Sequence, residues 1–327
     1  MRVSRSSALL SLVLTTLTLP SFAKINLSLR VLGRRADGYH EVRTVLQTIT
    51  LHDTLSFEAR DDWDAARLEI FCDDPAIPTD ERNLVAKAAR AIQRFYGTSR
   101  GTRVGIKKRI PAGGGLGGGS SNAAVALLAL SRLWRLPVSE TELTRLAGEL
   151  GADVPFFLTG GTALGTGIGA TITPLPNAEH NHLIVITPCV EVPTIVAFKA
   201  LNASPMDSLT KTNTTPILSV SHTTAIIEQF KLDEWRNDFE PTVFRLYPQT
   251  EAARMRLTDC GAHRVLLSGS GASLFGIFDK ADQARAFDEL SKSRSSTNWR
   301  VFNCATLDRE AYREALRSVL MVSDTKI

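Results

Sequence analysis

The chain has 327 residues and a formal net charge of +4, with 43% hydrophobic and 22% charged residues. This composition is typical of a soluble globular protein of about two domains, large enough to bury a core without disulfides. The mild positive charge suits a small anionic substrate, and no long block of like charge points to nucleic acid. The four cysteines form no CxxC pair and no zinc spacing, so we expect reduced thiols.

The first residues resemble a secretory signal. Arg2 and Arg5 precede the apolar run 8–19, and Ser21-Phe-Ala23 has the small residues of a cleavage site. No later segment is long and apolar enough to span a membrane.

The next segments predict an antiparallel, hairpin-rich sheet. Residues 24–32 alternate, with Ile25 and its apolar neighbours on one face and Lys24 with Asn26 on the other. The dipeptide Asp37-Gly38 is a strong hairpin signal. Further strands are expected over 42–51, 53–58 and 68–72.

Three helices are expected in the first half, over 83–96, about 120–135 and 139–150. Asn83 is the expected N-cap and Gly97 the stop of the first, and Ser139 with Glu142 has the spacing of a capping box in the third.

Between a predicted strand at 103–110 and the second helix lies a loop, 111–121, in which six of eleven residues are glycine. Glycine lets the backbone approach a ligand closely, and the helix that follows presents unpaired N–H groups and a positive dipole end. The segment therefore predicts a phosphate site, with a flexible linker as the alternative.

Asp153 follows the end of the third helix at Gly151 and precedes an apolar run. This is a poor place for a solvated surface charge; the structural alternative is an aspartate that caps a turn at Pro155. Short strands linked by a glycine-rich hairpin at 165–169 are expected next.

The composition shifts near 176–181, where we place the domain boundary. The second half is expected to be an α/β domain with a loop rich in Ser, Thr, Asn and Pro at 203–221. Its predicted strands are 183–187, 264–267, 274–278 and 299–305; its predicted helices are 192–201, 223–231, 241–259 and 281–292. A short helix and a polar tail are expected over 308–327.

Two common phosphate sites do not fit. A P-loop needs Gly-Lys-Ser/Thr, and these glycines lead into Ser120-Ser121-Asn122 without a lysine. A dinucleotide fingerprint expects a parallel βαβ unit with an acidic residue about 20 positions on, whereas the first hundred residues predict an antiparallel sheet.

The motifs together resemble the GHMP kinase superfamily: residues 111–121 resemble its motif 2, and Ser268-Gly-Ser-Gly-Ala-Ser273 its motif 3. Ala23-Lys-Ile-Asn-Leu27, Arg35-Ala-Asp-Gly-Tyr-His40 and Gly151-Ala-Asp-Val-Pro-Phe156 resemble one branch, the 4-diphosphocytidyl-2-C-methyl-D-erythritol kinases. The resemblance spans about residues 20–305.

The resemblance implies an α+β fold with a ribosomal protein S5 domain 2-like N-terminal domain and a ferredoxin-like C-terminal domain, with ATP and substrate in the cleft between them. The expected limits are an N-terminal extension over 1–20, an ATP-binding domain over 21–178, a C-terminal domain over 179–307 and a tail over 308–327.

The resemblance also implies the reaction, transfer of the γ-phosphoryl of ATP to the 2-hydroxyl of 4-diphosphocytidyl-2-C-methyl-D-erythritol in the non-mevalonate isoprenoid pathway. Asp153 would be the base, and Lys24 would polarise the hydroxyl and the γ-phosphate; the alternative for Lys24 is a structural salt bridge. A carboxylate beside an ammonium stays ionised and ready to accept a proton. Mg²⁺ is expected with ATP, with no ligands assigned.

The binding residues follow by the same resemblance. The triphosphate loop comprises Pro111, Ala112, Gly113, Gly114, Gly115, Leu116, Gly117, Gly118, Gly119, Ser120 and Ser121. The adenine site would involve Lys108, Asn83 and Leu84, and the supporting glycine motif Ser268, Gly269, Ser270 and Gly271. Tyr39 and Phe198 match positions that stack on cytosine, and Asn26, His40 and Thr194 match polar contacts. For Phe198 the alternative is core packing.

Export would separate such an enzyme from ATP, and cleavage after Ala23 would cut into its motif. We therefore expect a cytoplasmic enzyme, with residues 1–12 a start-site extension or disordered. The resemblance implies a monomer or weak homodimer, and no nucleic-acid or membrane partner is expected. The alternatives are another small-molecule kinase of the superfamily, of homoserine or mevalonate type, and a non-catalytic nucleotide-binding protein.

Overall fold

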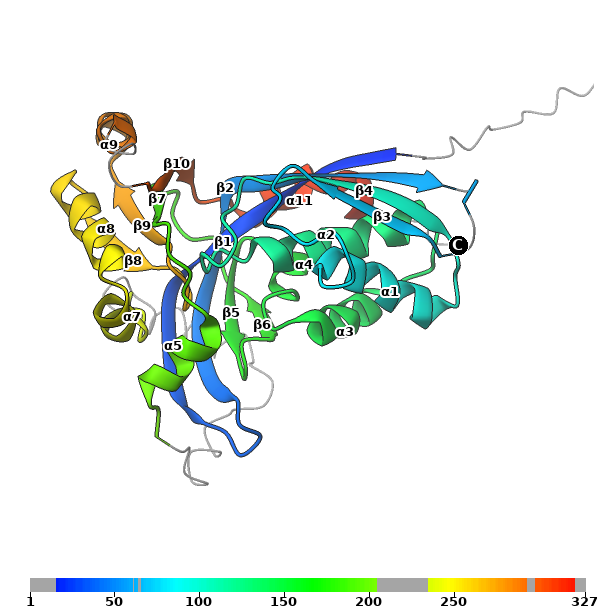
Figure 1. Cartoon of the computed structure of the whole chain (residues 1–327), viewed down its shortest axis with the longest axis horizontal. Coiled ribbons are helices and arrows are strands. Elements are labelled where there is room, and N and C mark those ends of the chain that lie inside the picture. Colours follow the sequence, from blue (N-terminus) through cyan, green and yellow to red (C-terminus); the bar gives the residue numbers. More distant parts are fainter. Residues whose placement is uncertain (1–15, 61, 64–65, 205–234, 293–297, 321–327) are drawn as a thin grey trace, which may run out of the picture.

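Two β-sheets, each covered by helices, organise the chain (Figure 1). The computed structural model describes residues 16–60, 62–63, 66–204, 235–292 and 298–320. Within this part of the chain no helix is long and apolar enough to cross a membrane.

The first sheet has the order β3-β4-β2-β5-β6, with β1 paired to β2. All neighbours are antiparallel except β3 and β4. Its strands are β1 (Thr16–Arg34), β2 (His40–Arg60), β3 (Leu68–Cys72), β4 (Gly101–Lys107), β5 (Thr162–Thr166) and β6 (Thr171–Pro174). The helices of this half are α1 (Leu84–Tyr96), α2 (Gly118–Leu133), α3 (Glu140–Leu150) and α4 (Phe156–Thr159).

The second sheet is antiparallel, with the order β10-β7-β9-β8. Its strands are β7 (His182–Thr187), β8 (Arg264–Leu267), β9 (Leu274–Phe278) and β10 (Arg300–Ala305). The helices described with it are α5 (Thr194–Leu201), α7 (Glu240–Leu246), α8 (Pro248–Asp259) and α9 (Lys280–Lys292).

Helix boundaries follow local chemistry. The Asn83 side chain accepts the N–H of Val85 at the start of α1, and Gly97 ends the helix in the left-handed region. Ser139 and Glu142 form the predicted capping box of α3. These predictions are confirmed.

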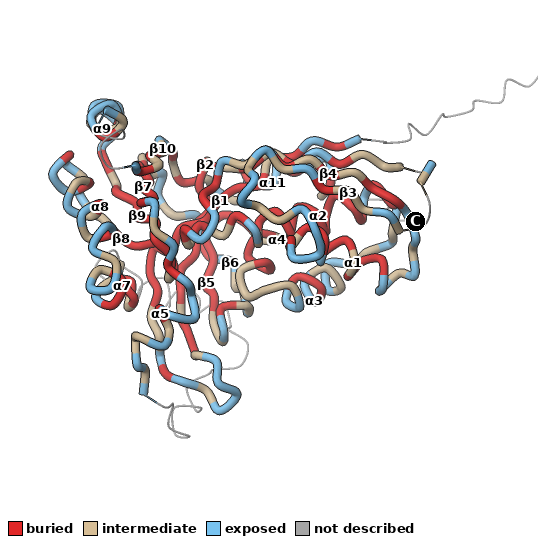
Figure 2. The backbone as a smooth tube through the Cα atoms, in the orientation of Figure 1, coloured by how far each residue is buried: buried red, intermediate tan, exposed pale blue. Residues whose placement is uncertain are grey.

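Three apolar clusters hold the fold together, and buried residues follow β1 and β2 through it (Figure 2). One lies between the first sheet and its helices, where the Ala/Leu-rich α2 is buried on almost every side. A second lies between the other sheet and its helices. The third joins the sheets, with Ile25 and Val45 packed in the same cluster as Leu183 and Phe275. The site between the two halves is therefore built on a common core.

Some elements differ from expectation. Strand β1 begins at Thr16, eight residues before the predicted start, and β2 is one strand rather than two. The predicted helix over 241–259 is two helices, because Pro248 cannot continue the first one.

The short helix predicted after residue 308 is present as α11 (Arg309–Ala315), and a second, α12 (Arg317–Leu320), follows it. Tyr312, Leu316 and Val319 of this stretch are buried in the core of the first half, which was not predicted. The predictions for residues 1–12, for most of 203–221 and for 223–231 lie outside the described residues. The domain limits stay a prediction.

Candidate active site

The glycine loop joins β4 to α2 and lines a cavity of about 310 Å³. Gly113, Gly115 and Gly117 have φ values of 67°, 79° and 72°, a region that residues with a side chain rarely adopt. Gly117 is the N-cap of α2, so the first N–H groups of a long helix lie at the cavity. The geometry is that of an anion site made by the backbone.

The cavity has an apolar side that the sequence did not reveal. Ile77, Pro78 and Leu84 line it together with the loop. Of the predicted adenine residues, Asn83 uses its side chain to cap α1 and to donate to the carbonyl of Pro78, so it shapes the wall. A flat apolar base fits such a wall.

The predicted loop residues differ in what they offer a ligand. Ser120 lines the cavity, whereas Ser121 is fully buried and its hydroxyl accepts a hydrogen bond from Ser21 at 2.7 Å. Leu116 is buried in the core between the sheets. Ser121 and Leu116 therefore anchor the loop.

Lys108 is held by an aspartate that sequence reasoning missed. Its ammonium donates to Asp53 Oδ2 at 2.8 Å and to the carbonyl of Ile110. Asp53 Oδ1 accepts the N–H groups of Arg109 and Ile110 at 2.8 Å, and the carboxylate is fully buried. The pair fixes the entry to the glycine loop, and Lys108 lines the same cavity, so its place at the adenine stays a prediction. The available signal was an acid inside an apolar strand pattern.

Lys24 lies beside the loop because β1 is irregular there. The β1–β2 register shifts between Phe22 and Ala23 and again between Asn26 and Ser28, and such bulges re-aim side chains. The backbone N–H of Lys24 donates to Leu116 of the glycine loop at 2.9 Å. Strand and loop are thereby locked together.

The Lys24 ammonium faces a carboxylate across the site. Its Nζ donates to Asn26 Oδ1 at 2.7 Å and lies 3.7 Å from Asp153 Oδ2. Burial lowers the pKa of Lys24 below its usual value, and Asp153 opposes that shift. The Lys24 side chain is 4% exposed and that of Asp153 39%, so the carboxylate has an open side that a hydroxyl can reach.

Asp153 lies in a series of tight turns between α3 and α4. The N–H of Val154 donates to Gly151, and the N–H of Phe157 donates to Val154. In the described part of the chain Lys24 is the one cation paired with Asp153, and the carboxylate caps no backbone N–H. The interpretation as a turn cap is therefore not supported.

The second glycine motif supports the loop, as predicted. The Ser268 hydroxyl donates to the carbonyl of Gly115 at 3.0 Å, and a Cβ on Gly271 would lie 2.3 Å from the Gly115 nitrogen. A Cβ on Gly269 would lie 3.2 Å from Lys24 Nζ. Asn237, which sequence reasoning missed, donates to the carbonyl of Gly269 at 2.7 Å. The motif therefore touches both the loop and the cation.

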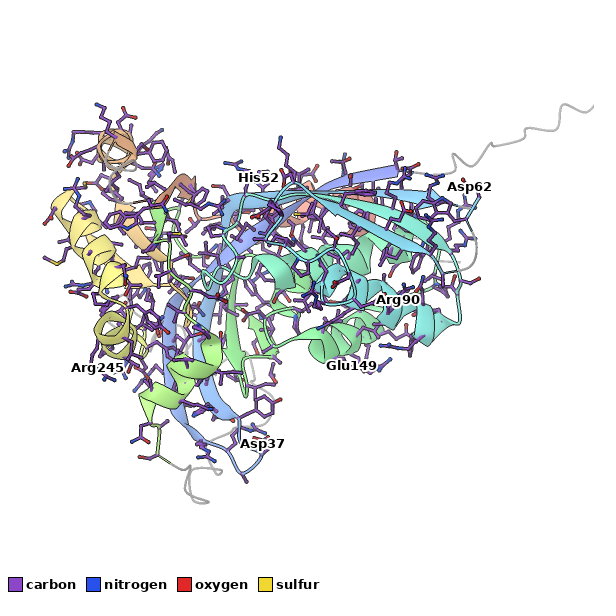
Figure 3. The ribbon with its side chains drawn as sticks, viewed as in Figure 1. Asp37, His52, Asp62, Arg90, Glu149 and Arg245 are labelled. Atoms are coloured by element: carbon purple, nitrogen blue, oxygen red, sulfur yellow. The ribbon has the colours of Figure 1, made fainter. Side chains whose placement is uncertain are left out.

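The predicted substrate residues are only partly brought together. His40 stacks on Phe198 with ring centroids 4.7 Å apart, and burial is the larger cause of the lowered pKa of His40. Phe198 also meets Phe239 edge-on at 4.8 Å, so it has a packing role as well. Tyr39 is 62% exposed in the β1–β2 hairpin, which projects below α5, with Asp37 at its tip (Figure 3).

The two remaining predicted residues have protein partners. Ser270 donates to the Thr194 hydroxyl at 3.2 Å, which places Thr194 beside the second glycine motif. The amide of Asn26 donates to Thr44, so Asn26 is a bridge between Lys24 and β2. The Asn26 side chain therefore orients Lys24.

One observation bears on Mg²⁺. The described residues contain no group of three or more His, Cys, Asp or Glu that could hold a metal. Asn122 lines the cavity, and its buried carbonyl oxygen has no hydrogen-bond partner. Oxygen ligands of this kind suit Mg²⁺, which takes few protein ligands and relies on phosphates and water for the rest.

A backbone phosphate loop whose cation and carboxylate come from other elements, placed between two such sheets, is the arrangement of a GHMP kinase. Residues 83–161 match the family model "GHMP kinases N terminal domain", and residues 224–295 match "GHMP kinases C terminal".

Within that class, the chain belongs to the family of 4-diphosphocytidyl-2-C-methyl-D-erythritol kinases. The protein of that name from Chlorobium limicola is 40% identical over 265 residues, which cover 81% of this chain and 89% of that protein. The one from Alkaliphilus metalliredigens is 38% identical over 84% of this chain and 92% of its own length.

Solved structures agree. The crystal structure of a 4-(cytidine 5'-diphospho)-2C-methyl-D-erythritol kinase has a TM-score of 0.68 at 33% identity and covers 89% of this chain and 99% of its own. A homoserine kinase from Cytophaga hutchinsonii has a TM-score of 0.66 at 19% identity, over 95% of this chain and 99% of its own, and shows the fold alone. The predicted family and α+β fold are confirmed.

Proposed function

We propose that the protein transfers the γ-phosphoryl group of ATP to the 2-hydroxyl of 4-diphosphocytidyl-2-C-methyl-D-erythritol, giving the 2-phosphate and ADP. The reaction belongs to the non-mevalonate route to isoprenoid precursors. The observation that carries the proposal is the pair formed by Lys24 and Asp153 beside the glycine loop.

Phosphoryl transfer depends on positioning and charge stabilisation. The N–H groups of the loop and of the first turn of α2 would donate hydrogen bonds to the phosphates. The adenine base would lie against Ile77, Pro78 and Leu84. The Lys24 ammonium, fixed by Asn26, would stabilise the charge on the transferred group.

Asp153 would take the proton of the substrate hydroxyl as its oxygen attacks the γ-phosphorus. Its Oδ2 lies 3.7 Å from the Lys24 ammonium. Mg²⁺ would neutralise phosphate charge when bound, and Asn122 is the residue that we propose to hold it, directly or through water.

The cytidine end of the substrate would lie against α5 and the β1–β2 hairpin. The stacked rings of His40 and Phe198 form one aromatic surface there, and Tyr39 is exposed on the hairpin. A base stacked on an aromatic side chain gains roughly 1–3 kcal/mol.

We also propose that the protein is cytoplasmic and that it is a monomer or a weak homodimer.

The test is a substrate panel with purified protein and ATP. ADP release is expected with the cytidine-diphosphate substrate and not with homoserine or mevalonate. Asp153→Asn is expected to lower kcat more than about a hundredfold with ATP affinity retained, since each 1.36 kcal/mol is a factor of ten. Asp73→Asn is the matched control because Asp73 is an exposed carboxylate outside the pair. Turnover of homoserine instead, or an active Asp153→Asn variant, contradicts the proposal.

A further inference from the structure

Helix α11 returns from the second half of the chain and lies against the segment that carries Asp153. Its residue Tyr312 is 1% exposed, and the phenol hydroxyl donates to the backbone carbonyl of Phe157 in α4. The ring lies 5.6 Å from that of Phe22, centroid to centroid. A Cβ on Gly160 would lie 2.2 Å from the Tyr312 ring, so the turn after α4 has room for this side chain only because it is glycine.

The start of α11 is fixed to the same region by backbone contacts. The Arg309 guanidinium donates to the carbonyls of Thr162 and Leu175. A Cβ on Gly161 would lie 2.7 Å from Cβ of Arg309. The hydroxyl of Thr48 donates to the carbonyl of Leu307 at 2.7 Å. The start of the helix is therefore docked at several points on β2, β5 and the turn that follows α4.

From α4 the contacts lead directly to the reacting groups. A Cβ on Gly117 would lie 2.7 Å from the Phe157 ring and 3.0 Å from Lys24 Cγ, so these two side chains converge on the N-cap of α2. The turns that run from Gly151 to Phe157 are hydrogen-bonded in succession and contain Asp153. Phe157 thus touches the phosphate loop with its ring and is tied through its backbone to the carboxylate.

We propose that Tyr312 is a positioning residue: through Phe157 it sets where Asp153 lies relative to Lys24 and the N-terminus of α2. The inference rests on the proposed function above. The matched family segments, 83–161 and 224–295, do not include it. A helix after the second domain thereby completes the catalytic geometry of the first.

The kinetic test compares Tyr312→Phe and Tyr312→Leu with Val319→Ala. Val319 is equally buried in the same core, but it lies on α12, which packs against α2. All three variants are expected to lower Tm. At a temperature where all are folded, kcat is expected to fall roughly five- to tenfold in Tyr312→Phe and further in Tyr312→Leu, with KM for ATP within twofold, because small misplacement of reacting groups is costly. A kcat within twofold of that of Val319→Ala in both Tyr312 variants overturns the proposal.

A second readout needs no substrate. Asp153 raises the pKa of Lys24 against the effect of burial, so displacing the carboxylate lowers that pKa further. The Lys24 ammonium is titrated by NMR of ¹⁵N-lysine-labelled protein, with Asp153→Asn as the reference for complete loss. In Tyr312→Phe the pKa of Lys24 is expected to fall part of the way to its value in Asp153→Asn, and in Val319→Ala it is expected not to change. An unshifted Lys24 in both Tyr312 variants refutes the positioning role. If the wild type fails to phosphorylate the cytidine-diphosphate substrate, the proposed function falls and this titration still decides the inference.

Discussion

Replacing Asp53 with asparagine is expected to lower the free energy of unfolding and to weaken ATP binding at the glycine loop. The carboxylate is fully buried and accepts three hydrogen bonds, one from the Lys108 ammonium and two from the N–H groups of Arg109 and Ile110. The variant keeps the shape but leaves an ammonium whose side chain is 4% exposed without its counter-charge.

The magnitude follows from that burial. Removing one partner of a buried ion pair costs about 3–5 kcal/mol. Lys108 keeps the carbonyl of Ile110 as an acceptor, so the lower end, about 3 kcal/mol, is expected. Asparagine keeps Oδ1 as the acceptor of the Arg109 and Ile110 N–H groups but turns an amide N–H donor toward Lys108. Because the loop entry then loses its ion pair, KM for ATP is expected to rise roughly tenfold, equivalent to about 1.4 kcal/mol.

Urea unfolding and steady-state kinetics measure the two effects. Asp73→Asn is the control, since Asp73 accepts the N–H of Lys108 from the exposed side. The double variant with Lys108→Met is expected to recover at least about 1 kcal/mol relative to Asp53→Asn alone, because it removes both buried charges. If Asp53→Asn is as stable as Asp73→Asn, the buried pair does not hold the loop.

Three further predictions concern the site itself. Burial lowers the pKa of Lys24 below 10.5, so kcat should fall in a pH–rate profile as pH rises through that lowered pKa. The lowered pKa also means that the charged Lys24 costs folding free energy at every pH below it, and this cost disappears as pH rises to 10.5. Lys24→Met should therefore be inactive yet at least as stable in urea at pH 7. Gly117→Ala should lower the free energy of unfolding by more than about 2 kcal/mol, because φ is 72° and the Cβ would clash with Phe157, whereas Gly119→Ala, with 3.5 Å to its nearest neighbour, should change it by less than about 0.5 kcal/mol. Phe198→Leu should raise KM for the cytidine-diphosphate substrate roughly tenfold and leave KM for ATP unchanged, and an equal rise in both would show a packing role alone.

Local signals predicted local structure. The cap at Asn83, the capping box at Ser139 and the hairpin at Asp37 depend on neighbours within a few residues, and the structure has all three. The long strand β2 was predicted as two strands, 42–51 and 53–58, and the second of them begins at an acid, Asp53. That acid is paired with Lys108, 55 positions away, and no local pattern reports such a partner.

The candidate site was predicted unevenly for the same reason. The glycine loop is a local feature, and its role follows from backbone chemistry alone. Lys24 and Asp153 are 129 positions apart, and their pairing depends on the bulges of β1 and the turns before α4. Only resemblance to a family linked them in advance. Tyr312 lies in a seven-residue helix, too short to be recognised as part of the core from its own sequence.

The absence of a lysine from the glycine loop has a structural consequence. In this fold the loop supplies backbone N–H groups, and the cation comes from β1, whose Lys24 N–H donates to the loop at Leu116. Under the proposed function, the distance between the ammonium and a bound phosphate would be set by strand register and not by a flexible side chain of the loop. Gly269 lies on the other side of the ammonium, where a Cβ on this glycine would be 3.2 Å from Lys24 Nζ. The Phe157 ring lies against Gly117, the N-cap of α2. Three elements from different parts of the chain must therefore meet before the ammonium takes this position, which makes the proposed catalytic site dependent on contacts far beyond the glycine motif.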